Sequence, residues 1–383
     1  MTSDREKIAS RLPEHLRRDL KVAAAAQHQD IQDVVTEALT RWRHAAPQPA
    51  VATAGAASFG TWVPAHVWAE FGDECQRRGI SIIQGLAQAV RLWLHQHSTR
   101  QEFHVQHIPQ RKIIANQKGG VGKTALSAGL AQAYAEGTEY EGFGLRVLMI
   151  DFDPQGHLTA QAGFEPLPMN GDTLVKHMTK KPEGLIADLV VQVEGERFGN
   201  RLHLLPAAAD GFMLDVGLVS DPTIRVREAT LQQALEPIEA DYDVIIIDCP
   251  PSLGLAMDTA LYYGRHRPGE ATGASGVLIP VEAEDSSADA FALLTGQIES
   301  LRQDMRLTIE YLGLVVNKYD SRRGFIATSS LKQWQAMEDP SVIGVLQDRK
   351  EQREAVRAKE GLLAYAPQSV QADVMREIAR NLT

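Results

Sequence analysis

The stretch NQKGGVGKTAL, residues 116–126, is the most informative part of this sequence. It follows an apolar run and leads into ALSAGLAQAYAE, a pattern of small residues typical of a buried helix. Glycines in the loop let backbone N–H groups turn toward an anion, and the start of the helix adds the positive end of its dipole. A glycine-rich loop between a strand and a helix is the context of a phosphate-binding loop.

Two residues at the end of the loop have expected roles in nucleotide binding. Lys123 is expected to neutralise the β- and γ-phosphates of a nucleotide, and the Thr124 hydroxyl to ligate Mg²⁺. A glycine-rich turn with incidental lysines is the alternative, but average residue usage produces this pattern in about one chain in ten thousand or fewer. The residues expected around the phosphates are Gly119, Gly120, Val121, Gly122, Lys123, Thr124 and Ala125.

Length and composition limit the class of protein and the number of domains. The 383 residues, 44% hydrophobic and 23% charged, are typical of a globular protein with two or three domains. The formal charge of −10 argues against a surface covered with DNA-binding charge and leaves room for a local basic patch. Cys75 and Cys249 lack metal-ligand spacing, no apolar run is long enough to cross a bilayer, and the start of the chain has no signal region. A cytoplasmic protein is therefore expected.

Residues 111–383 are expected to form one α/β domain. Short apolar runs such as LRVLMID, YDVIIIDC and SGVLIPVE alternate there with helix-like segments. Uninterrupted apolar strands between helices indicate a mostly parallel sheet that is covered on both faces. The predicted fold is a doubly wound, mostly parallel sheet, preceded by a smaller, mainly helical domain at 1–96 and a linker at 97–110.

The N-terminal domain contains an internal repeat. Shifted by 51 positions, residues 11–42 overlay 62–93 with five identities. Two amphipathic helices can share that many residues by chance, but in both copies a proline opens the first helix and a capping residue, Asp30 or Ser81, precedes the second. We interpret the pattern as a duplication whose copies are joined near 44–58 by a linker rich in Ala, Pro and Gly.

The phosphate loop departs from the common G-x-x-x-x-G-K-[ST] form, because Gln117 replaces the first glycine and Lys118 follows it. In this it resembles the deviant Walker ATPases of the ParA/MinD family, whose loop reads K-G-G-x-G-K-[ST]. The resemblance implies that the nucleotide is ATP and that Lys118 reaches across a homodimer interface to the phosphates of the partner subunit's ATP. Ala125 stands where the family usually has a second Thr, which should cost at most one phosphate contact.

A second stretch, LMIDFDPQGHLT at 148–159, resembles the family motif D-x-D-P-Q-G-N. The resemblance implies that Asp153 orients the attacking water and that Asp151 lies near Mg²⁺. His157 stands where the family usually has Asn, a difference that affects local loop contacts and leaves the two acids in place.

Two more stretches follow in the family order. YDVIIIDCPPSLG at 242–254 is a strand that ends at Asp248, where a carboxylate beside the phosphate loop can hold Mg²⁺ through water. LVVNKYDSRRG at 314–324 resembles the ParA segment in which an Asn reads the adenine edge, which gives Asn317 that role.

The C-terminal region resembles ParA more than MinD. MinD ends in a basic amphipathic helix that binds membrane, whereas the last residues here, MREIARNLT, lack bulky aromatic anchors, so no membrane partner is expected. In this family ATP-bound dimers bind DNA without sequence preference through basic residues near the C-terminal helices. A solvated helix face of mixed charge is the alternative. The candidates by position are Arg322, Arg323, Lys332, Arg349, Lys350, Arg353 and Arg357.

Each N-terminal copy resembles a ribbon-helix-helix unit, in which two strands pair into a ribbon that enters the DNA major groove. Two copies allow the ribbon to form within one chain. In the first strand Ile8 and Leu12 are expected to face the core, and the residues expected to face outward are Lys7, Ala9 and Arg11. In the second they are Ser58, Gly60 and Trp62, a poor set for reading bases. A helical module for dimerisation or adaptor binding is the alternative.

Together these resemblances imply a cytoplasmic, nucleoid-associated ATPase that partitions a plasmid or another DNA element. ATP would promote dimerisation and nonspecific DNA binding, and a centromere-binding, ParB-like adaptor would stimulate slow hydrolysis and release the protein from DNA. Two alternatives stay open: a DNA-binding transcriptional autorepressor that ATP modulates, and a ParA-like ATPase that positions a protein cargo.

Overall fold

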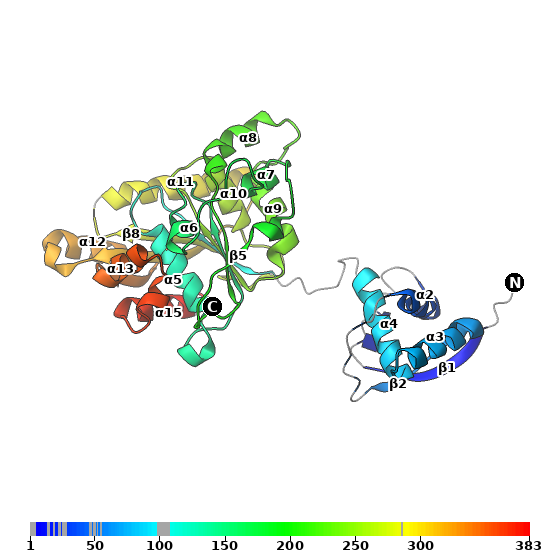
Figure 1. The fold of residues 1–383 in the computed structure, drawn as a ribbon. Helices are drawn as coiled ribbons and strands as arrows, with labels where there is room; N and C mark the ends of the chain where they lie inside the picture. Colours follow the sequence, from blue (N-terminus) through cyan, green and yellow to red (C-terminus); the bar gives the residue numbers. More distant parts are fainter. Residues whose placement is uncertain are drawn as a thin grey trace. The chain divides into compact units, whose positions relative to one another are not determined.

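The computed structural model describes residues 5–13, 16–17, 20–21, 24, 29–45, 48, 51, 53, 56–97, 108–284 and 286–383. The chain divides into two compact units, Met1–Gln106 and His107–Thr383 (Figure 1). Most of the predicted linker at 97–110 lies outside the described residues, and Gln110 at its end already belongs to the first strand of the second unit.

The N-terminal unit is built on a two-stranded antiparallel ribbon. Strand β1 (Arg5–Leu12) pairs with strand β2 (Ala57–Pro64) within the one chain. The side chains alternate as expected, because Ile8 and Leu12 are buried while Lys7, Ala9 and Arg11 are exposed. The outward residues in the middle of the ribbon are Lys7, Ala9 and Arg11 of β1 and Ser58, Gly60 and Trp62 of β2.

Helices pack against the inner face of this ribbon. They are α2 (Ile31–His44), α3 (Ala65–Arg77) and α4 (Ile82–His97), and the described residues at 16–17, 20–21 and 24 are helical as well. Their apolar sides form one core with the inward residues of the ribbon. The predicted linker near 44–58 is described only in part; within it Val51 is buried in this core, and β2 begins at Ala57.

The two copies of the sequence repeat occupy equivalent places. Residues 51 positions apart are buried in the same core, and the pairs are Leu12/Val63, Leu16/Val67, Leu20/Phe71, Val35/Leu86, Ala38/Ala89, Leu39/Val90 and Trp42/Trp93. In the ribbon, Ala9 lies opposite Gly60, which is its own counterpart in the second copy. A local two-fold relation therefore passes through this pair of residues.

The second unit is built on an eight-stranded sheet in the order β10-β9-β8-β3-β7-β4-β6-β5. The strands are β3 (Gln110–Ile114), β4 (Val147–Asp151), β5 (Val191–Gln192), β6 (Leu202–Leu205), β7 (Val244–Asp248), β8 (Gly276–Glu282), β9 (Tyr311–Tyr319) and β10 (Val342–Gln347). Every neighbouring pair is parallel except the edge pair of β5 and β6. The predicted doubly wound, mostly parallel sheet is confirmed.

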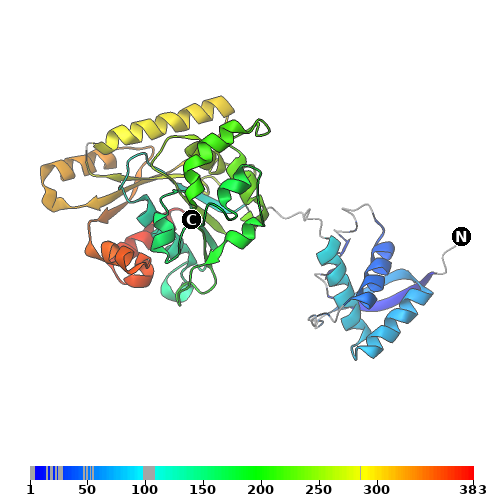
Figure 2. The ribbon, with the colours of Figure 1, turned by 45° about the horizontal axis from the view of Figure 1, so that its top comes forward.

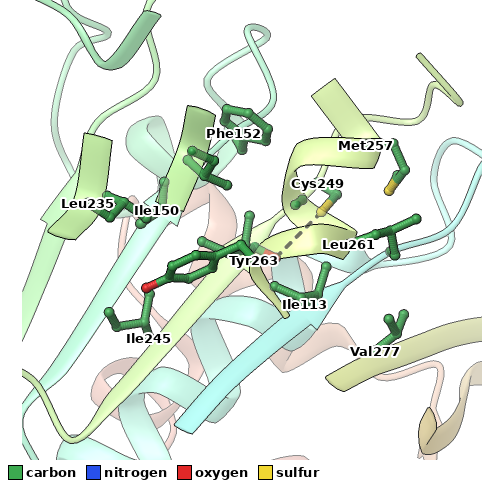
Figure 3. Packing of buried hydrophobic residues seen from close by; sticks show 14 of the residues in the cluster. Ile113, Ile150, Phe152, Leu235, Ile245, Cys249, Met257, Leu261, Tyr263 and Val277 are labelled. Carbon is green, nitrogen blue, oxygen red and sulfur yellow. Dashed lines mark hydrogen bonds between the residues drawn. The ribbon is translucent and has the colours of Figure 1, made fainter. Parts of the chain in front are cut away.

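One face of the sheet is covered by α9 (Thr230–Glu239), α10 (Leu255–Tyr263) and α11 (Ser286–Met305). Alternate residues of the buried strands, among them Ile113 and Ile245, point into this core, where they meet Tyr263 of α10 and Cys249 after β7 (Figure 3). Cys249 is therefore a fully buried free thiol, as expected of a cysteine that contributes to packing rather than to reactivity.

The opposite face is covered by α5 (Lys123–Ala135), α14 (Leu362–Tyr365) and α15 (Val370–Asn381). Figures 1 and 2 show α11 and α15 on opposite sides of the sheet. Ile114 and Ile246, the neighbours in sequence of residues that point to the first face, enter this second core.

Further elements complete the second unit. They are helices α6 (His157–Gln161), α7 (Leu174–Met178), α8 (Leu214–Ser220), α12 (Phe325–Gln335) and α13 (Lys350–Ala358), and turns η1 (Thr138–Tyr140), η2 (Ile186–Leu189), η3 (Ala209–Met213) and η4 (Ser321–Arg323). Within the described part of the chain, no helix has the length and apolar character needed to cross a membrane.

Candidate functional site

The phosphate loop lies at the carboxyl edge of the sheet, because it follows β3, which runs between β8 and β7. Gly120 and Gly122 have positive φ angles of 78° and 94°, a conformation that residues with a Cβ rarely adopt. A Cβ on Gly122 would also lie 1.9 Å from the side-chain nitrogen of Asn317. The loop can therefore turn into α5 at Lys123 only with glycine at these positions.

Lys123 is held inside this loop. Its side chain is mostly buried, and its Nζ donates a hydrogen bond to the carbonyl of Lys118 at 3.3 Å. Burial lowers the pKa of Lys123, and the nearby carboxylate of Asp248 opposes that effect. A buried ammonium group within a glycine loop at a helix start suits the phosphate oxygens of a nucleotide.

Two acidic side chains meet beside the loop at the ends of neighbouring strands. Asp151 ends β4 and lies opposite Asp248, which ends β7. One oxygen of Asp151 accepts hydrogen bonds from the N–H and the hydroxyl of Thr159, both at 2.7 Å, and one oxygen of Asp248 accepts from the Ser127 hydroxyl at 3.0 Å. The second oxygen of each carboxylate is buried and has no hydrogen-bond partner among the described residues.

The two carboxyl groups resist ionisation. Burial raises the pKa of Asp151 to about 6, and burial together with the charge of Asp151 raises the pKa of Asp248 to about 7. A bound cation would neutralise these charges and give the unpaired oxygens a partner.

Mg²⁺ fits this pair of acids, because its ligands are oxygens and it is usually held by one or two carboxylates together with phosphates and water. Thr124 lies beside Asp248, so the structure brings together the three residues predicted to hold the metal: Thr124, Asp151 and Asp248. When bound there, the cation would neutralise charge on the phosphates.

Mg²⁺ binding is expected to weaken in acid. Asp248 is mostly ionised at pH 8 and mostly protonated at pH 6, so at the lower pH the cation must displace a proton. With a pKa of about 7, the apparent affinity should fall about tenfold between pH 8 and pH 6. The measurement is the Mg²⁺ concentration that gives half of the thermal stabilisation by ATP at each pH.

Asp248→Asn is the matched control for the Mg²⁺ measurement. The titration of ATP itself is the same with the native chain and with the variant, so it cancels in the comparison. The folded-state pKa of Asp248 lies above its ordinary value of 3.8, so its favourable contribution to stability is lost as the pH rises through about 7. The variant should thus stabilise the nucleotide-free chain at pH 8, by roughly 1–3 kcal/mol. Equal Mg²⁺ affinity of the native chain at the two pH values would contradict the assignment.

Asp153 lies next to these acids on the open side of the site. It is partly exposed, and one of its oxygens accepts a hydrogen bond from the N–H of Gln155 at 3.0 Å. Asp151 and Asp153 both line a cavity of about 320 Å³, whose other walls include Phe212 and Pro250. A partly exposed carboxylate on a cavity that admits water is compatible with the predicted role of orienting a water molecule.

Lys118 pairs with two acids that the sequence analysis missed. Its Nζ lies 3.2 Å from Glu282 and 3.4 Å from Glu284, at and just beyond the end of β8. Glu282 also pairs with Lys318, and Glu284 with Arg323, both at 3.0 Å. The sequence held no signal for this contact, which arises because β8 is a parallel neighbour of β3 and the two strands end at the same edge of the sheet.

Asn317 and Lys318 fasten the phosphate loop. The Asn317 side-chain nitrogen donates a hydrogen bond to the Val121 carbonyl at 2.8 Å, and the Lys318 Nζ donates to the Gly120 carbonyl. Asn317 is buried, so this hydrogen bond is shielded from water. Its predicted contact with adenine stays a prediction.

The remaining predicted positions differ in burial. Val121 is fully buried, Ala125 is half-buried in the first turn of α5, and His157 is exposed at the first residue of α6. Several of the basic residues predicted to meet DNA have acidic partners, and the pairs are Arg322–Asp320, Arg323–Glu284, Lys350–Glu354 and Arg353–Asp348. Exposed ion pairs of this kind are weak and can exchange partners.

The sequence of this chain is similar to those of known proteins. The family model AAA_31, described as an AAA domain, matches residues 111–311. The sporulation initiation inhibitor protein Soj of Bacillus subtilis is 31% identical over 278 residues, and the match covers 71% of this chain and 98% of Soj.

Two solved structures share the fold of the second unit. The complex of Cyanothece McdA with ATP has a TM-score of 0.58 at 20% identity and covers 72% of this chain and 96% of McdA. Cobyrinic acid a,c-diamide synthase of Mycobacterium smegmatis, with a bound ATP analogue and magnesium, has a TM-score of 0.53 at 26% identity and covers 71% of this chain and 93% of that protein.

Proposed function

This chain belongs to the ParA/MinD family of P-loop ATPases, and on that premise we propose that it partitions a plasmid or another DNA element. It is an ATPase with ATP and Mg²⁺ as cofactors. In the proposed cycle, ATP binding drives dimerisation, the dimer binds DNA without sequence preference, and hydrolysis releases it. The protein would accordingly reside on the nucleoid in the cytoplasm.

The proposal rests on one observation: two lysines of the same loop differ in burial and in their partners. Lys123 is buried inside the loop, whereas Lys118 is partly exposed at its rim and is paired with Glu282 and Glu284. A rim lysine can exchange these carboxylates for the more highly charged phosphates of a second subunit. Dimerisation would then depend on ATP.

Nonspecific DNA binding by the ATP-bound form is expected to depend strongly on salt, because phosphate contacts release counterions and carry no sequence information. Four phosphate contacts would weaken binding by about 100-fold between 50 and 200 mM salt. The measurement is fluorescence anisotropy on two unrelated duplexes, with and without ATP, at both salt concentrations.

Lys123→Ala supplies the baseline for this experiment, since it should bind little ATP. Binding that is the same with and without ATP, or that ignores salt, would contradict the proposal. Substitution of Arg349, Lys350, Arg353 and Arg357 by alanine in sets of two should lower the slope of log Kd against log salt if α13 and its start contact DNA.

A centromere-binding, ParB-like adaptor is the partner proposed to stimulate hydrolysis. A second candidate function, a transcriptional autorepressor modulated by ATP, is favoured by one observation: the ribbon of the N-terminal unit presents Lys7 and Arg11 to solvent. The two functions differ in where specificity resides, because the autorepressor needs a sequence-specific contact that acts without the ATPase site.

A further inference from the structure

The start of α12 carries the most exposed large apolar side chain among the described residues. Phe325 is 84% exposed, and its neighbour Ile326 is 63% exposed. They follow the turn η4, and all six residues of 321–326 are exposed. Figures 1 and 2 show α12 at one end of the second unit. Two adjacent bulky apolar side chains in contact with water indicate a surface that binds a partner.

These two side chains are not needed to hold α12 in place. The helix is anchored through its other side, where Ala327 and Trp334 are buried. The Trp334 ring packs edge-on against Phe291 of α11, with 5.5 Å between the ring centroids, and its N–H donates a hydrogen bond to the Glu282 carbonyl at 3.1 Å. Phe325 is therefore presented to solvent at the first residue of a firmly anchored helix.

The surroundings of the apolar pair are basic, although the whole chain has a formal charge of −10. Residues 321–337 contain two arginines, one lysine and no acidic residue. Arg322 and Arg323 form exposed ion pairs with Asp320 and Glu284, which are weak and can be exchanged for phosphates. The first turn of α12 also lacks an acidic side chain, so the positive end of the helix dipole is not neutralised there. A negatively charged partner fits this surface.

The same edge of the sheet carries the start of α13. The N–H of Asp348 donates a hydrogen bond to the Tyr319 carbonyl at 3.0 Å, which places the end of β10 beside the end of β9. Arg349 and Lys350, two of the residues proposed to contact DNA, follow directly in the sequence. The segment that contains Phe325 and the start of α13 therefore leave the sheet side by side.

We propose that Phe325, with Ile326 beside it, inserts between two base pairs of DNA and bends the duplex at that step. Insertion presupposes the proposed binding of DNA by the ATP-bound form, and it adds a contact with the bases that phosphate contacts do not supply. Apolar side chains such as Phe and Ile are used as wedges by proteins that kink DNA from the minor groove. A membrane fits less well, because one pair of apolar side chains buries little area.

An inserted side chain gives a preference for flexible DNA without reading the identity of the bases. Pyrimidine–purine steps such as TA unstack easily, whereas A-tracts are stiff. Duplexes with central TA steps should therefore be bound several-fold more tightly than duplexes of the same length and A·T content that contain an A-tract. Phosphate contacts alone would not distinguish the two, because both duplexes carry the same charge.

The test uses the full chain with ATP and duplexes of about 30 base pairs that carry a fluorophore at each end. The native chain should shorten the end-to-end distance of the bound duplex, and it should raise the fluorescence of 2-aminopurine at a central TA step. Phe325→Ala should lose both signals and the preference for TA steps. It should also bind about 10-fold more weakly, because the contact between an aromatic ring and a base is lost.

Three further variants separate insertion from phosphate contact and from folding. Phe325→Leu should still bend the duplex, because leucine also acts as a wedge. Leu185→Ala removes another apolar side chain, 69% exposed, and should bind and bend DNA like the native chain. Arg322→Ala should lower the slope of log Kd against log salt by about one and leave the bend unchanged. All of the replaced side chains are exposed, so these variants should fold.

The possible results distinguish insertion from DNA binding itself. ATP-dependent, salt-dependent binding without a bend, or a bend that persists in Phe325→Ala, would overturn insertion and leave the proposed function intact. Absence of ATP-dependent binding to every duplex would overturn both. Insertion would also be overturned if Phe325→Ala kept the bend but lost ATP-induced dimerisation, which would assign the pair to a second copy of the chain, or lost binding to anionic lipid vesicles, which would assign it to a membrane.

Discussion

Lys118→Ala is expected to lower ATP turnover about 10³-fold or more while ATP still binds. In the proposed dimer Lys118 acts on the partner subunit's phosphates, and a cationic group supplied in this way typically contributes 10³- to 10⁵-fold to phosphoryl transfer. Each subunit's own phosphates would be held by Lys123 and the glycine loop. The variant should therefore bind ATP with near-native affinity and fail to dimerise productively.

Lys123→Ala is the matched comparison in the same loop. Its ammonium group would make charge-assisted hydrogen bonds to the β- and γ-phosphates, each worth about 1.5–3 kcal/mol. Loss of two such bonds should weaken ATP affinity about 100-fold or more. Equilibrium nucleotide binding and light scattering with ATP, measured on both variants, separate the two roles.

Glu282→Gln controls for the ion pair seen in the single chain. If Lys118→Ala acted only by breaking the contact with Glu282, the glutamine variant would reproduce its loss of turnover. We expect instead that Glu282→Gln keeps ATP binding and dimerisation. A loss of ATP affinity in Lys118→Ala equal to that in Lys123→Ala would refute the role of Lys118 in trans.

Asp153→Ala should lower the rate of hydrolysis about 10²- to 10⁴-fold without loss of ATP binding, the range expected when a positioned acid–base group is removed. Asp153 lines the open cavity, and the residues suited to hold Mg²⁺ and phosphate, among them Asp151 and Lys123, remain in place. The expected product is an ATP-bound dimer that stays on DNA.

Turnover and retention on DNA should be measured together for this variant. Asp151→Ala is the informative comparison, because it removes the neighbouring carboxylate from the expected metal site and should weaken Mg²⁺ binding as well as hydrolysis. Normal hydrolysis by Asp153→Ala would show that the acid is misassigned, with Asp151 the next candidate.

The sequence alone predicted the main elements of the α/β sheet and the position of the phosphate loop after its strand. Uninterrupted apolar runs between helices predicted the parallel sheet, and the glycine pattern placed Lys123 and Thr124, because both signals are local and depend only on residues close in the chain. The alternation of buried and exposed side chains along each ribbon strand also depends only on neighbouring residues. The outward residues Lys7, Arg11 and Trp62 could therefore be named from their spacing.

Contacts between residues that are distant in the chain could not be read from the sequence. Three features of the site depend on the order of strands in the sheet. They are the ion pair of Lys118 with Glu282, the unpaired oxygens of Asp151 and Asp248, and the hydrogen bond from Asn317 to the phosphate loop. The same holds for the ribbon, where the register that sets Ala9 against Gly60 arises between strands about fifty residues apart. Sequence periodicity specifies which side of an element is buried, whereas the partner across the sheet is chosen by packing of the whole domain.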